Sequence, residues 1–200
     1  MEAAVTDLTI LLLSNFTVTL LVLGLLTAGI GMLRARRHGL LTASVVWGRL
    51  LDHFLLLSVG VSYLYNFVMH SVFGDFTAEI IGWNQSPFQL EVAFASLGFA
   101  AVGFLAFPRR QGWMVKLAAL LGPAIFLWGA AGGHIYQLLT AGNQAQGNAG
   151  SVLYTDILLP VAGFVFLWGF AATTRRDGEV REVMVAAETV DASSHPADRL

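Results

Sequence analysis

Five stretches of the chain are each apolar over about the length that a helix needs to cross a bilayer, roughly 20 residues. They cover approximately residues 9–33, 54–73, 88–107, 117–139 and 151–172. Soluble domains carry about 25% charged residues, whereas charged residues make up 12% of this chain of 200 residues. The pattern predicts an all-α fold, a polytopic membrane helix bundle with five transmembrane helices in a lipid bilayer.

The basic residues all fall on one side of these five spans. They follow the first and fifth spans, precede the second and join the third to the fourth: Arg34, Arg36, Arg37, Arg49, Arg109, Arg110, Lys116, Arg175, Arg176, Arg181 and Arg199. Loops rich in Lys and Arg remain on the cytoplasmic side. The sequence therefore predicts an N-terminus outside and a C-terminus inside.

Residues 1–172 are expected to form one transmembrane domain, and residues 173–200 a cytoplasmic tail. The tail is charged and rich in Ser and Ala, which predicts little fixed structure apart from a short helix near residues 180–188. Residues 40–53 are expected to continue the second helix along the cytoplasmic interface, with Arg49 and Asp52 as a local ion pair.

Composition excludes several function classes. The net charge of -2 and the lack of a basic patch argue against a nucleic-acid partner. The chain has no cysteine, which removes disulfides, thiolate metal sites and iron–sulfur clusters. Only His53, His70 and His134 lie in or next to spans, too few for the four axial ligands of two haems, and we expect no haem.

Four spans place an ionisable residue at a similar depth. His70, Glu91, His134 and Asp156 lie three to five residues from the predicted outer ends of their helices, roughly 5–8 Å deep at about 1.5 Å per residue. Charged groups in a bilayer core cost about 2.5–3.5 kcal/mol, so they need partners or water. Because small residues share the faces of Glu91, His134 and Asp156, we expect these three to point inward.

This layer admits several chemistries, and the residues alone leave them open. The four side chains could hold a divalent metal, a proton or another ion could pass along them, or they could line a pocket for a small ligand from the outer side. They could also form a hydrogen-bond network that only fixes the bundle, as in an accessory or assembly subunit. A metal- or haem-dependent membrane enzyme is a further alternative.

Binding or passage of a small ligand or ion is the leading interpretation, and catalysis is not expected. Glu91 and Asp156 would act as acceptors or proton carriers, with His134 as the titrating partner or ligand. The residues expected to support them are His70, Gln137 and Asn148. Two carboxylates so close should not both stay charged without a cation between them.

Three segments resemble a bacterial family of small integral membrane proteins known only as a domain of unknown function. They lie at residues 82–92, 128–135 and 143–160, and match the patterns G-W-x-x-S-P-F-Q-x-E-V, W-G-x-x-x-G-H-I and N-x-A-x-G-N-A-G-x-V-x-Y-x-D-I-L-x-P. The resemblance covers about residues 50–172. It implies a multi-pass protein of the bacterial inner membrane and implies no activity. Its motif positions include Glu91, His134, Asn148 and Asp156.

Overall fold

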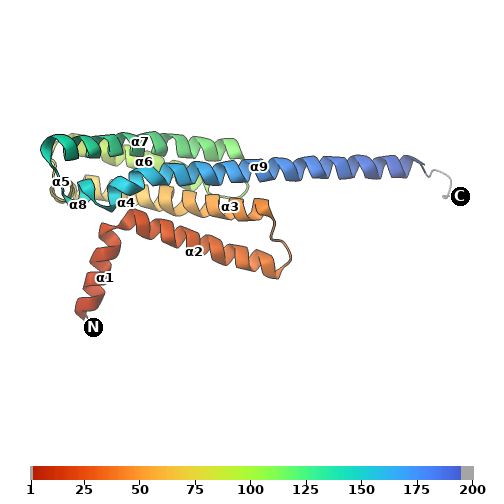
Figure 1. The fold of residues 1–200 in the computed structure, drawn as a ribbon, viewed down its shortest axis with the longest axis horizontal. Coiled ribbons are helices and arrows are strands. Elements are labelled where there is room, and N and C mark those ends of the chain that lie inside the picture. The colour runs from red at the N-terminus through yellow and green to blue at the C-terminus, as the bar shows by residue number, and fades with distance from the viewer. Residues whose placement is uncertain (1, 195–200) are drawn as a thin grey trace.

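The computed structural model is a bundle of long helices (Figure 1), and it describes the backbone of residues 2–194 and the side chains of residues 6, 8, 9 and 11–185. Every regular element in that part of the chain is helical. The elements are α1 (Glu2–Ser14), α2 (Phe16–Arg37), α3 (Ala43–Phe54), the π-helix η1 (Leu55–Val61), α4 (Ser62–Val72), α5 (Gly74–Ile81), α6 (Phe88–Ala106), α7 (Trp113–Ala141), α8 (Gln146–Ala149) and α9 (Ser151–Ser194).

Five of these helical segments are long and apolar enough to cross a membrane, which confirms the predicted all-α bundle and its five candidate spans. They are α2, the continuous helix α3–η1–α4, α6, α7, and the segment that begins in α8 and continues in α9. The predicted positions of the second to fifth spans fall within these helices. The sequence therefore locates the spans correctly from hydropathy alone.

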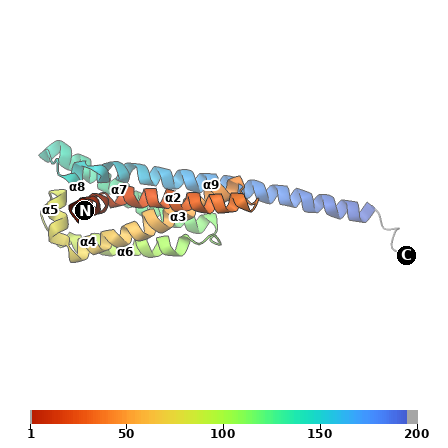
Figure 2. The same ribbon diagram turned by 90° about the horizontal axis from the view of Figure 1, so that it is seen from below.

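The helix α3–η1–α4 lies in the middle of the bundle. Its α3 part packs against α2 and α9, and its η1 and α4 parts pack against α6, as Figure 2 shows from below. The backbones of η1 and α6 approach each other closely at Gly60 and Gly103, where a Cβ on Gly103 would lie 2.8 Å from the Gly60 nitrogen. Only glycine permits this contact.

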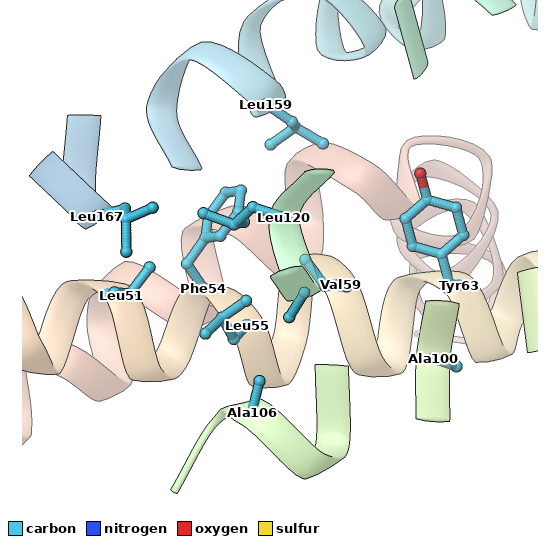
Figure 3. Packing of buried hydrophobic residues seen from close by; sticks show 11 residues of the cluster. Leu51, Phe54, Leu55, Val59, Tyr63, Ala100, Ala106, Leu120, Leu159 and Leu167 are labelled. Atoms are coloured by element: carbon cyan, nitrogen blue, oxygen red, sulfur yellow. The ribbon is translucent and has the colours of Figure 1, made fainter. Parts of the chain in front are cut away.

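A continuous apolar core follows this central helix (Figure 3). Its members include Leu51, Phe54, Leu55, Ala100 and Leu120, each less than 5% exposed. Leu159 and Leu167 of α9 complete it from the opposite side. The core separates two ends of the bundle. We call them the His134 end, where α5 and α8 lie, and the Lys116 end, where α2 joins α3 and α6 joins α7 (Figure 1).

The first span begins later than the sequence predicts. The helix breaks at Asn15, and α1 turns away from the bundle while α2 enters it (Figure 1). The Asn15 side chain donates to the carbonyl of Leu11 at 2.9 Å and accepts from Ser151 of α9 at 2.7 Å. An asparagine that bonds to nearby backbone competes with the helix ladder. The spanning helix therefore starts at Phe16, not near residue 9.

The chain beyond the fifth span differs from the expected loose tail. The helix α9 continues without interruption from Ser151 to Ser194 and projects beyond the bundle (Figure 1), so the short helix expected near residues 180–188 is part of a much longer one. Residues 173–194 contain no proline and several good helix formers, so no residue terminates the helix. The expectation for residues 195–200 lies outside the described residues.

Candidate functional site

Two connections at the His134 end are docked onto each other. Asn143 donates from Nδ2 to the carbonyls of Ile81 at 2.9 Å and Gly82 at 3.3 Å, and its Oδ1 accepts from the Ala145 backbone at 3.0 Å. Gly82 ends α5 with a positive φ of 73°, and a Cβ there would lie 2.8 Å from Asn143 Oδ1. Glycine is thus required both by the backbone and by the contact. We call these two connections, residues 81–87 and 142–150, the cap.

Asn148 of α8 is the centre of the cap and is completely buried. Its Nδ2 donates to the backbone carbonyls of His134 at 3.2 Å and Asn143 at 3.0 Å. Its Oδ1 accepts from Trp83 Nε1 at 3.2 Å and lies 2.9 Å from His134 Nδ1. A primary amide has two donors and two acceptor positions, so every polar position of Asn148 is occupied.

These contacts determine which nitrogen of His134 carries a hydrogen. An indole nitrogen can only donate, so the Asn148 atom that faces Trp83 must be the oxygen. That same oxygen faces His134 Nδ1, and two acceptors cannot bond to each other. Nδ1 therefore carries a hydrogen and donates it to Asn148. The hydrogen bond at Nδ1 leaves the other ring nitrogen, Nε2, as the position that can gain or lose a proton.

His134 Nε2 faces Asp156 across the interface of α7 and α9. The Nε2–Oδ2 distance is 3.7 Å, and the two residues are only 6% and 3% exposed. The Trp83 ring lies beside the imidazole, with centroids 5.4 Å apart. A lone pair on a neutral imidazole would repel a carboxylate, so this buried pair needs a proton on one of the two groups. The sequence correctly predicts that both residues point inward.

Glu91 does not join them, and the expectation that it points inward is wrong. Its side chain is exposed, together with Ala95 and Gly98 on the same face of α6. The inward face carries Ala93 and Ser96 instead. Small residues occupy both faces of α6, so their presence could not identify the side that packs. On this inward face, Ser96 Oγ accepts a hydrogen bond from Asn66 Nδ2 at 2.9 Å.

His70 and Gln137 also lie outside the network of His134. The His70 ring hydrogen-bonds to Gln89 Oε1 of α6 and lines an open groove of about 680 Å³ with Asp75 and Gln85. Gln137 contributes only its backbone carbonyl, which accepts from the Asn143 nitrogen at 3.3 Å. Within residues whose side chains are described, no three His, Asp or Glu residues lie close enough to hold a metal ion. The four expected metal ligands are therefore not assembled.

Sequence reasoning missed a second buried ion pair, at the Lys116 end. Lys116 is completely buried, and its Nζ donates to Asp52 Oδ1 at 2.7 Å and to the carbonyls of Ala106 at 3.0 Å and Pro108 at 3.4 Å. The sequence suggested that Asp52 pairs with Arg49. In the structure Asp52 pairs with Lys116 instead. The sequence did contain a signal for this pair. Asp52 lies in an apolar helix at about the depth at which Lys116 begins another span.

Comparison with known proteins gives a family but no activity. No curated protein and no solved structure is found to match the chain. The model of one protein family, described as a family of unknown function, matches residues 14–176. The match includes α2, which the resemblance seen in the sequence did not cover, and it contains His134, Asn148 and Asp156. The chain therefore belongs to the DUF6790 family.

Proposed function

We propose that this membrane protein binds and releases a proton at the buried pair His134–Asp156. The observation that carries the proposal is the position of His134 Nε2, which faces the Asp156 carboxylate while Nδ1 is held by Asn148. Imidazole is the side chain whose ordinary titration range includes neutral pH. A buried imidazole beside a carboxylate is an arrangement suited to carrying a proton.

The size of the site favours a proton over a larger ligand. His134 and Asp156 are both buried, and Trp83 and Asn148 occupy the space at the Nδ1 side of the ring. The groove beside His70 is lined by other residues. The gap of 3.7 Å between Nε2 and Oδ2 holds one proton after a small movement of either side chain, without a change in the backbone.

Binding is better supported than free passage through the bundle. The apolar core lies between this pair and the pair Lys116–Asp52, and Leu51, Leu55 and Leu120 of that core are at most 4% exposed. A proton cannot cross such a layer without a continuous chain of waters or polar groups from one side to the other. The site is therefore proposed to exchange its proton at the His134 end.

We further propose that the His134 end faces the outside of a bacterial inner membrane. The basic residues near the spans lie at the Lys116 end or beyond it in α9, as cytoplasmic segments require. A reporter enzyme fused after Leu200 should be active in the cytoplasm, and one inserted at residues 143–150 should be active in the periplasm. The reverse pattern would place the proton site on the cytoplasmic side.

Nitrogen NMR of the purified protein with ¹⁵N-labelled histidine tests the proton site. We expect Nδ1 of His134 to keep its hydrogen while Nε2 gains and loses a proton, and Asp156→Asn to alter the response of Nε2 because a neutral amide replaces the carboxylate that faces it. The exposed His38 serves as an internal reference. A titration of His134 that Asp156→Asn leaves unchanged would overturn the proposal.

A second candidate is a purely structural layer in an accessory or assembly subunit. All four hydrogen-bonding positions of the Asn148 side chain are used. This favours the structural candidate, because a saturated network holds the cap on the bundle without any further role. The same NMR experiment separates the two candidates. A structural His134 would show one fixed protonation state over the whole pH range in which the protein stays folded.

A further inference from the structure

A small interior cavity lies between the central helix and the helices α7 and α9. It offers about 20 Å³ to a water molecule and is lined among others by Ser58, Tyr63, Pro123 and Pro160. One buried water needs about 10–15 Å³ measured in this way and two to four polar partners. The cavity is therefore large enough for one water and too small for an organic ligand.

The Ser58 hydroxyl supplies the first polar partner. Ser58 is 4% exposed, and its Oγ has no hydrogen-bond partner in the described part of the chain. A buried hydroxyl without a partner keeps the full cost of its desolvation. Serines in helices commonly bond to the carbonyl one turn earlier, as Ser71 does to Phe67 at 2.6 Å. Ser58 does not make this usual bond, so its buried hydroxyl is available to a bound molecule.

The π-helix η1 brings a second hydroxyl to the same side. The Ser62 nitrogen donates to the Leu57 carbonyl, five residues earlier, and this wider turn rotates Tyr63 towards the face that carries Ser58. Both residues line the cavity. Figure 3 shows the Tyr63 hydroxyl directed to the side from which Leu159 of α9 enters the core. It donates to the Pro123 carbonyl at 3.2 Å, which leaves its oxygen free to accept.

We infer that this cavity binds one water molecule that bridges the Ser58 and Tyr63 hydroxyls. The water accepts from Ser58 Oγ and donates to Tyr63 Oη, so that both hydroxyls gain a partner. The inference concerns these two hydroxyls alone and stands apart from the proposed proton site.

Thermal unfolding of the purified full-length protein tests the water through Ser58→Ala. If Ser58 bonds to a water, the change removes a hydrogen bond, and the unfolding temperature should fall by roughly 2–4 °C, as a chain of this size shows for one such bond. If the cavity is dry, Ser58→Ala removes an unpartnered hydroxyl, and the temperature should stay the same or rise. Ser71→Ala is the matched control and should change it by less, because the Ser71 hydroxyl bonds to its own helix and such a bond slightly destabilises the helix.

Tyr63→Phe and the double variant complete the test. Two hydroxyls that share one water should be coupled, so the double variant should lose less stability than the two single losses together. Additive losses, or a stabilising Ser58→Ala, would overturn the inference. A structure determined at a resolution that shows ordered waters should have density between Ser58 and Tyr63, and its absence would also overturn it.

The two proposals can fail separately. The bridging water concerns stability and density at Ser58, whereas the proton site concerns the NMR titration of His134. A His134 that does not titrate removes the proton site and leaves the coupling of Ser58 and Tyr63 intact. Additive losses at Ser58 and Tyr63 beside a titrating His134 remove only the water.

Discussion

The two ends of the bundle each contain a buried pair of a basic and an acidic side chain, and the pairs are built differently. Lys116 Nζ lies 2.7 Å from Asp52 and also donates to two backbone carbonyls, so its three hydrogens are all used. His134 Nε2 lies 3.7 Å from Asp156, and only the opposite nitrogen of its ring is hydrogen-bonded. The first pair is fully hydrogen-bonded, whereas the two side chains of the second pair are too far apart for a hydrogen bond.

The difference follows from the chemistry of the two cations. A lysine ammonium carries three donors and no acceptor, so it stays buried only if several acceptors surround it. An imidazole can be buried in neutral form with one nitrogen donating and the other accepting. We therefore interpret the pair Lys116–Asp52 as a fixed clamp between α3 and α7, and the pair His134–Asp156 as the one that changes state.

The largest effect is expected for Lys116→Ala. The change removes the ammonium that contacts the buried Asp52 carboxylate, and breaking comparable buried pairs costs about 3–5 kcal/mol of stability. Chemical denaturation in detergent should show this loss, while Arg110→Ala in the nearby exposed connection of α6 and α7 should have little effect. Combining Lys116→Met with Asp52→Leu should restore most of the stability, because an apolar pair replaces the ionic one.

A smaller loss is expected for His134→Ala. It removes the partner of Asp156 and one hydrogen bond to Asn148, at a cost of about 1–3 kcal/mol. Asp156→Asn should cost less, since it keeps the shape and leaves no buried charge. In a double-mutant cycle the two changes should be coupled by more than about 0.5 kcal/mol. A coupling below that value would show that the 3.7 Å contact has no energetic role.

The sequence predicts the bundle and part of the site for a clear physical reason. Apolar runs and one-sided basic residues are imposed by the bilayer, so the five spans can be read directly. His134 and Asp156 stand out because ionisable residues are costly at that depth. The sequence could not show which face of α6 packs inward, because small residues line both sides of this helix, including the side of Glu91. Lys116 looked like a loop cation, because its burial depends on acceptors from the distant residues Asp52 and Ala106.

Trp83→Phe sharpens the assignment of the His134 tautomer. The change keeps an aromatic ring beside the imidazole and removes the indole donor to Asn148 Oδ1, at a cost of about 0.5–1.5 kcal/mol. The His134 Nδ1 signal should then move, because Asn148 Oδ1 accepts from one donor in place of two. Trp113→Phe at the Lys116 end is the control and should leave that signal in place. An unmoved signal in Trp83→Phe would contradict the shared acceptor.

The smallest effect is expected for Glu91→Gln, and it decides whether the proton site is a pair or a larger cluster. Because Glu91 is exposed on the outward face of α6, the change should alter stability by no more than about 0.5 kcal/mol, as surface substitutions usually do. Combined with His134→Ala, it should be additive within about 0.3–0.5 kcal/mol. A cycle that combines His134→Ala with Asp156→Asn, in place of Glu91→Gln, should show coupling. If Glu91 were coupled to His134 as strongly as Asp156 is, the exchangeable proton would belong to three residues and α6 would have to rotate to bring Glu91 inward.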